Sequence, residues 1–166
     1  MGMKGHANNT HHKKEKDKPI LLTGNLLHYG EKNLNGRIYT KEMAERIVEQ
    51  FENRDGEMFG ELGYPDRFEV LLTQVSHKVE EIHLDEENKS VVGTIKILDT
   101  PKGKIVKAML DTDEYIGLTC RPRGAGTVNE NSEIENYTLY SFDLVSGPDA
   151  FANIKKDDHL TILEDE

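Results

Sequence analysis

Residues 70–98 read VLLTQVSHKVEEIHLDEENKSVVGTIKIL, and this stretch decides the fold. Two runs rich in β-branched residues, 70–84 and 90–98, flank the polar segment DEENK, which is typical of a turn. Strands joined by so short a connection pair in the antiparallel direction. The stretch therefore predicts a β-hairpin.

The sequence on either side of this hairpin adds further strands. Residues 20–27 form an apolar run interrupted by Gly24, and residues 137–147 alternate strongly between apolar and polar side chains. Residues 159–163 are a shorter candidate strand, whereas the glycine-rich run RPRGAG, residues 121–126, is typical of a turn. We therefore expect a mostly antiparallel sheet or barrel.

Two helices are predicted to pack on this sheet. Thr40 is a good N-cap for a helix over residues 41–52, whose apolar side chains recur at helical spacing. Thr100 and Pro101 suit the start of a second helix. Its apolar face is predicted to consist of Ile105, Val106, Met109 and Leu110. The fold class that follows is α+β, with helices packed on an antiparallel sheet.

Length and composition favour a single folded domain over residues 20–166. A chain of 166 residues with 36% hydrophobic content is long enough for one core. We expect no membrane contact, because no run approaches 18 consecutive apolar residues. A single cysteine excludes an internal disulfide and a cysteine-cluster metal site, and His11-His12 lacks a second spaced pair, so we expect neither metal nor cofactor.

Charge separates an N-terminal arm, residues 1–19, from the rest of the chain. The arm carries a net charge of +3 and the whole chain −10, which leaves −13 for the remainder. Its lysines are Lys4, Lys13, Lys14, Lys16 and Lys18. A body this acidic repels nucleic acid, so we expect no specific nucleic-acid binding by the folded domain. The arm is either a solubilising leader or a segment that binds an acidic partner.

The stretch IGLTCRPRG, residues 116–124, holds the most reactive side chains of the chain. Thr119 and Cys120, the only cysteine, end a strand-like run and are candidate nucleophiles. The residues around them, Gly117, Arg121, Arg123 and Gly124, could form an anion-binding turn similar to an oxyanion hole. They could equally form a surface loop whose arginines pair with the domain's own carboxylates.

Six blocks along the chain resemble, in order, those of the prohead core proteases of tailed bacteriophages, which are relatives of the herpesvirus assemblin fold. They are NLNGRIYTKEM, GELGYP, VSHKVEEI, GTIKILDTPKGKIVKAML, IGLTCRPRGAG and YSFDLVSGPDAF, within residues 33–151. The resemblance implies a prohead-protease architecture. It also implies a serine-type endopeptidase that cleaves scaffold and shell proteins inside the immature capsid.

The chain departs from this family at both catalytic positions. By the resemblance, Tyr64 stands where the family has its histidine, and Thr119 where it has its serine nucleophile. A phenol with a reference pKa of about 10 is protonated at neutral pH and cannot accept the nucleophile's proton. Threonine keeps a hydroxyl, but its methyl group restricts χ1 and crowds the attack. We therefore expect no intact catalytic set.

Cys120 and His77 are the residues that could replace the lost pair. A thiol is a stronger nucleophile than a hydroxyl, but successive strand residues point to opposite faces, so Cys120 should point away from a site built around Thr119. His77, in the strand-like run VSHKV, could be a base or a structural histidine. Both alternatives remain open for each residue.

Three functions follow from these observations. The first, which we favour, is an auxiliary or decoration protein of the phage capsid that keeps the fold without its chemistry. The second is an active maturation endopeptidase with unusual residues, and the third is a module that binds a scaffold peptide without cutting it. The partner that we expect is the major capsid protein or the scaffold protein, with multiple copies of the chain on a symmetric shell. We expect the chain in the virion or capsid after synthesis in the bacterial host cytoplasm.

Overall fold

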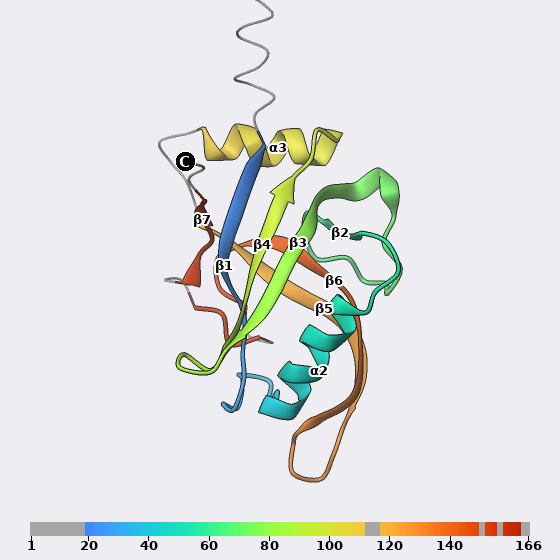
Figure 1. The fold of residues 1–166 in the computed structure, drawn as a ribbon, viewed down its shortest axis with the longest axis vertical. Coiled ribbons are helices and arrows are strands. Elements are labelled where there is room, and N and C mark those ends of the chain that lie inside the picture. The colour runs from blue at the N-terminus through green and yellow to red at the C-terminus, as the bar shows by residue number, and fades with distance from the viewer. Residues whose placement is uncertain (1–18, 112–116, 150–151, 156–157, 164–166) are drawn as a thin grey trace, which may run out of the picture.

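A computed structural model describes residues 19–111, 117–149, 152–155 and 158–163 (Figure 1). Residues 1–18, which hold all five lysines of the predicted N-terminal arm, lie outside the described residues. The elements follow in the order β1 (Ile20–His28), α2 (Lys41–Glu52), β2 (Met58–Glu61), a 3-10 helix (Leu72–Gln74), β3 (Val75–Asp85), β4 (Ser90–Ile97), α3 (Pro101–Leu110), β5 (Leu118–Val128), β6 (Ile134–Ser146) and β7 (Thr161–Ile162).

The predicted hairpin is confirmed and forms the middle of a five-stranded antiparallel sheet. Strands β3 and β4 pair from His77 opposite Ile97 to Asp85 opposite Ser90, and the sheet order is β2-β3-β4-β1-β7. Residues 70–74 were predicted to continue the strand, but 72–74 form a 3-10 turn. Strand β2, which the sequence did not indicate, pairs with β3 at the sheet edge.

Helix α2 begins and ends where the sequence places it. The Thr40 side chain accepts a hydrogen bond from the Met43 amide at 3.1 Å, which satisfies one of the free N–H groups of the first turn. The side chains that face the core, Met43, Ala44, Ile47 and Phe51, are those at helical spacing in the sequence.

Helix α3 also begins at the predicted cap, but its buried face is narrower than predicted. Thr100 accepts from the Gly103 amide at 3.0 Å, and Gly103 lies so close to the ends of β3 and β4 that a Cβ atom would fall 1.8 Å from the Leu98 carbonyl oxygen. Val106 is fully buried, whereas Ile105, predicted to face the core, is 45% exposed. Met109 and Leu110, also predicted to face the core, are partly buried against it, so Ile105 is the one residue of the predicted face that turns outward.

Strands β5 and β6 form a long two-stranded ribbon behind the five-stranded sheet (Figure 1). The predicted turn at residues 121–126 is wrong, because this run lies inside β5 and pairs with β6. Glycine lets the two strands come together closely: a Cβ atom on Gly124 would lie 2.3 Å from the Tyr137 ring. The glycines therefore permit a close crossing, and no turn forms.

The edge of β6 that does not pair with β5 is held by two other parts of the chain. Gln50 of α2 donates to the Tyr137 carbonyl at 2.8 Å and accepts from the Leu139 amide at 2.9 Å. Further along β6, the Gly63 amide donates to the Leu144 carbonyl at 2.8 Å. These contacts fix α2 and the end of β2 on the ribbon. Among the described residues, no helix is long and apolar enough to cross a membrane.

Candidate functional site

One face of the β5–β6 ribbon is the floor of a cleft of about 450 Å³, and residues 63–68, which follow β2, form its wall. The cleft is rich in guanidinium groups and aromatic rings, from Arg37, Arg67, Arg121, Arg123, Tyr39, Tyr64, Phe68 and Tyr137. The wall carries the predicted family position Tyr64, whose side chain is 59% exposed. Thr119 lies at the start of β5, beyond the residues that line the cleft.

Thr119 is fully buried, and its hydroxyl is already engaged. Its Oγ1 donates to the Gly147 carbonyl oxygen at 2.6 Å. Gly117 and Gly147 both have positive φ, and the Gly147 amide donates to the Gly117 carbonyl at 3.0 Å, so the ribbon end closes over Thr119. A nucleophile must transfer its proton to a base. The proton of this hydroxyl is instead held in a hydrogen bond to a peptide carbonyl, which cannot act as a base.

Cys120 points to the opposite face of β5 and belongs to the hydrophobic core. It is fully buried, and this burial raises the pKa of its thiol well above the ordinary value, with the nearby Asp143 carboxylate adding to the effect. The thiolate, which is the reactive form, is therefore suppressed at neutral pH. Cys120 therefore points away from Thr119, as the alternation of side chains along a strand predicts.

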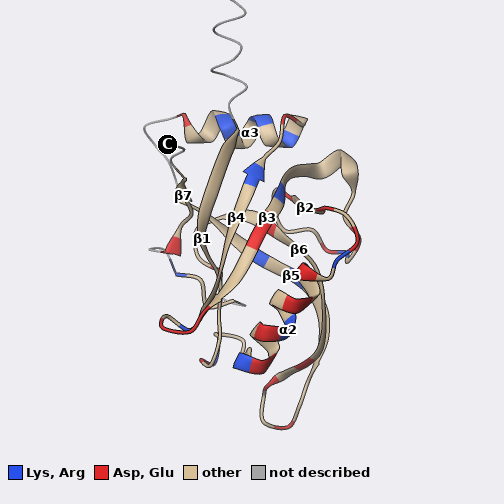
Figure 2. Cartoon of the chain, viewed as in Figure 1, with Lys and Arg blue, Asp and Glu red and all other residues tan. Residues whose placement is uncertain are grey.

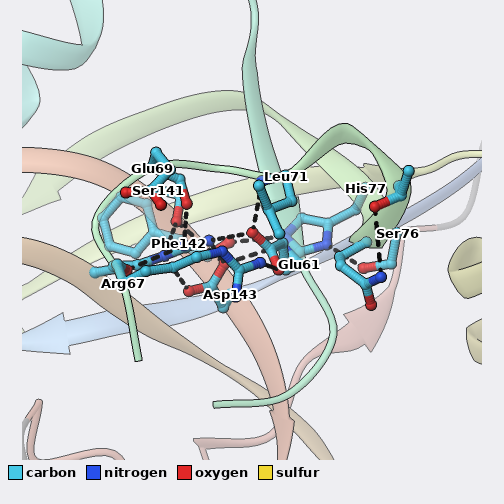
Figure 3. A network of polar contacts seen from close by, with 12 residues as sticks. Glu61, Arg67, Glu69, Leu71, Ser76, His77, Ser141, Phe142 and Asp143 are labelled. Carbon is cyan, nitrogen blue, oxygen red and sulfur yellow. Dashed lines mark hydrogen bonds and ion pairs between the residues drawn. The ribbon is translucent and has the colours of Figure 1, made fainter. Parts of the chain in front are cut away.

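His77 is also fully buried and links the two sheets (Figure 3). Its Nε2 lies 2.7 Å from the Phe142 carbonyl oxygen, which can only accept, so Nε2 carries the proton. Its Nδ1 then accepts from the Ser76 hydroxyl at 2.7 Å. Both nitrogens are used, and burial lowers the pKa of the imidazole to about 4. In this position His77 joins β3 to β6 and is not available as a base for Cys120 or Thr119.

The buried neutral His77 should make the protein lose stability in mild acid. In the unfolded chain a histidine has a pKa of about 6.5. Between this pH and about 4, the unfolded state binds a proton that the folded state excludes. The contribution of neutral His77 to the free energy of unfolding is therefore complete above pH 6.5. About 3 kcal/mol of this contribution is lost as the pH falls to 4.

Urea denaturation at several pH values, compared between wild type and His77→Gln, isolates this contribution from that of the carboxylates. The glutamine amide can still donate to the Phe142 carbonyl, but it does not titrate. We expect the two curves of unfolding free energy against pH to converge as the pH falls. Parallel curves would show that His77 is protonated or exposed in the folded protein.

Arg123 lies at the centre of a buried network of charges. Figure 3 labels its partners Glu61 and Asp143. Its Nε and Nη2 donate to the two carboxylate oxygens of Asp143, each at 2.9 Å, and Nη2 also contacts Glu61 at 3.2 Å. Its Nη1 donates to the backbone carbonyl of Glu69 at 2.9 Å, which fixes the cleft wall. Arg123 is therefore a structural clamp. It pairs with the domain's own carboxylates, as one of the two alternatives predicted, but it does so from a buried strand and not from a surface loop or an anion-binding turn.

Glu61, at the end of β2, ties the cleft wall to the same network. Its carboxylate accepts from the Leu71 amide at 3.0 Å and from the guanidinium groups of Arg67 and Arg123. Burial alone raises the pKa of this carboxyl, but these hydrogen bonds outweigh it and lower the pKa below the ordinary value. Glu61 is thus ionised at neutral pH, although only 2% of the residue is exposed.

Arg121 fills the space between Tyr64 and the buried end of the ribbon. Its guanidinium lies 5.1 Å from the centroid of the Tyr64 ring, and its Nε lies 3.5 Å from Asp149. Burial raises the pKa of the Asp149 carboxyl, and Arg121 acts in the opposite direction. Because Arg121 is two residues from Thr119, both project from the same face of β5. Arg121 thus contacts Tyr64 from the face of β5 that also carries Thr119.

Sequence reasoning missed several residues of this region. Glu61 and Asp143 lie within the blocks GELGYP and YSFDLVSG, and the only signal was a single acidic residue in an otherwise apolar strand. His159 was not singled out either: its Cβ lies 3.5 Å from the position that a Cβ on Gly117 would occupy. The folding of the C-terminal segment against β5, where the Leu160 amide donates to the Leu118 carbonyl at 2.7 Å, brings it there.

The fold is similar to that of a phage capsid protease. In a comparison with solved structures, the chain is similar to gp21, the capsid assembly protease of bacteriophage T4, with a TM-score of 0.65 and 23% sequence identity over 76% of this chain and 81% of that one. The sequence matches the family described as prohead core protein serine protease over residues 5–163, and the chain belongs to this family. No match was found among the curated proteins.

Proposed function

We propose that this chain is a non-cleaving member of the prohead core protease family that acts as a capsid-associated structural protein. The observation that carries the proposal is the state of Thr119, at the family's nucleophile position. Its hydroxyl is buried and donates its only proton to the Gly147 carbonyl. The side chain at the family's base position, Tyr64, contacts Arg121 instead.

Cys120 and His77, the residues that could replace the lost pair, are equally unsuited to catalysis. Cys120 is held as a buried thiol, and the imidazole of His77 has both nitrogens in hydrogen bonds within the core. Loss of the nucleophile or the base of a serine protease lowers kcat by about 10⁴ to 10⁶. A chain altered at both positions keeps the fold of the enzyme but has no base in place to accept the proton of the nucleophile.

One observation favours the alternative of an active endopeptidase. His159 is exposed and lies beside Gly117. Gly117 in turn stands two residues before Thr119 in the chain. If the ribbon end opened, this imidazole could accept the proton of the Thr119 hydroxyl. The proposed function therefore has to be tested against this histidine and not only against His77.

A cleavage assay tests the proposal directly. Purified wild-type chain, incubated at neutral pH with the denatured shell and scaffold proteins of its phage, should give no fragments above background by mass spectrometry. Thr119→Val, which keeps the side-chain shape, and Cys120→Ser and His159→Ala should not differ from wild type. Cleavage that Thr119→Val or His159→Ala removes would establish the active endopeptidase and end the proposal.

The cleft supports a third possibility, a module that holds a scaffold peptide without cutting it. A space of about 450 Å³ beside β5 is large enough for several side chains of an extended segment. Quantitative mass spectrometry of immature and mature heads separates the two non-cleaving roles. We expect the chain in mature heads in high copy number, as a structural subunit requires. Its presence in immature heads alone would favour the peptide-binding module.

A further inference from the structure

The outward face of α3 is apolar along its middle. The helix packs on the core through Gly103, Val106, Met109 and Leu110. The residues at i, i+4 and i+7 on the other side, Pro101, Ile105 and Ala108, are exposed. Ile105 is 45% exposed. A surface helix normally turns charged residues to solvent, and this ridge holds one large apolar side chain, so the case for a contact surface rests on the ridge together with the charges beside it.

Lysines flank this ridge on both sides. Lys102 and Lys104 lie one residue to either side of Gly103, and at 100° per residue they fall on opposite flanks of the ridge. Lys107 pairs with Asp99. Within the part of the chain that the structure describes, neither Lys102 nor Lys104 forms an ion pair. The face of α3 is therefore an apolar ridge between two available cations, although the chain as a whole carries −10.

Helix α2 carries the complementary charge. Its solvent side presents four exposed glutamates at i, i+3, i+7 and i+10, which form one ridge: Glu42, Glu45, Glu49 and Glu52. None of the four forms an ion pair among the described residues. Like charges at these spacings destabilise a helix, so cations brought against the ridge would relieve the repulsion. The methylene groups of the glutamates can cover an apolar side chain such as Ile105.

The two ridges cannot meet within one molecule. Helix α3 packs on the ends of β3 and β4, whereas α2 lies against β6 toward the other end of the sheet (Figure 2). We propose that α3 of one copy docks on the glutamate ridge of α2 of a second copy. This contact is heterologous, so each copy keeps one ridge free for the next, and the assembly grows as an open chain unless it closes into a ring.

Sedimentation velocity of the full chain tests this self-association. At low ionic strength and increasing protein concentration, the sedimentation coefficient should rise, and it should return to the monomer value in 0.5 M NaCl, where screening shortens the range of the charges. A coefficient that stays at the monomer value at every concentration in low salt would overturn the proposal.

Charge reversal identifies the surfaces. Lys102→Glu with Lys104→Glu places acids in the first turn of α3, and Glu49→Lys with Glu52→Lys places cations in the last turn of α2, so both changes suit the helix dipole and should leave the helices folded. Each double variant alone should weaken association at least tenfold. A mixture of the two, or one chain with all four changes, should recover it, because the reversed ridges are again complementary.

A matched control separates this contact from the effect of net charge. Lys32→Glu with Lys89→Glu alters two exposed lysines away from α3 and changes the net charge by the same amount. It should leave association within about twofold of wild type. Weakening equal to that of the α3 variant, or no recovery in the mixture, would show that the two ridges do not form the contact.

Discussion

Replacement of Arg123 by methionine is expected to lower the free energy of unfolding by about 3–5 kcal/mol, because it leaves the buried Asp143 carboxylate without its cation and removes one of the two guanidinium groups that bind Glu61. Asp143 and Glu61 are each 2% exposed and are bound by the same guanidinium. Urea denaturation at pH 7 measures the change. The matched control is Arg37→Met in the same cleft, which removes an exposed guanidinium and should alter the unfolding free energy by less than about 0.5 kcal/mol.

A triple variant tests the cause of this loss. Arg123→Met combined with Glu61→Gln and Asp143→Asn removes the uncompensated charges while keeping hydrogen-bonding groups of the same size. It should recover part of the lost stability, since an uncharged amide is easier to bury than an unpaired carboxylate. If the triple variant were less stable than Arg123→Met, the loss would come from packing and not from charge.

Gly60→Ala is the second substitution for which we expect a large effect. It should lower the free energy of unfolding by about 3 kcal/mol or more. A Cβ atom at this position would lie 2.2 Å from His77 Nε2 and 2.3 Å from the Phe142 carbonyl oxygen. The methyl group would therefore separate the donor and acceptor that join the two sheets, adding the cost of a lost buried hydrogen bond to that of overpacking. Chemical denaturation at pH 7 measures the sum.

Gly56→Ala is the control, because it measures the cost of replacing a glycine without any steric clash. Gly56 has φ +79° but open space around it, so alanine there meets only conformational strain, about 1–2 kcal/mol. Gly60→Ala should also weaken the acid dependence assigned to His77, because a displaced imidazole becomes accessible to water. An effect of Gly60→Ala no larger than that of Gly56→Ala would mean that the sheets move apart at little cost.

Local signals in the sequence were sufficient for much of the fold. The caps Thr40 and Thr100 fix where the two helices begin, and the turn after Asp85 fixes the hairpin, because each depends on residues only a few positions apart. The glycine-rich run at residues 121–126 was predicted as a turn but lies in β5. Its glycines serve a contact with Tyr137, a residue of the next strand, and that contact depends on tertiary structure.

The site was harder to predict than the fold for the same reason. The alternation of side chains along a strand correctly predicted that Cys120 faces the core, because this prediction requires only that the segment be a strand. The roles of Arg123 and His77 depend on Asp143 and Phe142, which lie 20 and 65 residues away along the chain. No local pattern indicates whether a charged or polar side chain will find such a partner, so a clamp and a catalytic group look alike in the sequence.

Gln50 has a consequence for how the protein avoids aggregation. The primary amide of its side chain makes the same two hydrogen bonds to Tyr137 and Leu139 that a neighbouring strand would make. An exposed strand edge is a template on which an extended segment of another molecule can add and begin a fibre. By occupying one such position on β6 with a side chain from a helix, the fold blocks strand addition there without adding a strand of its own.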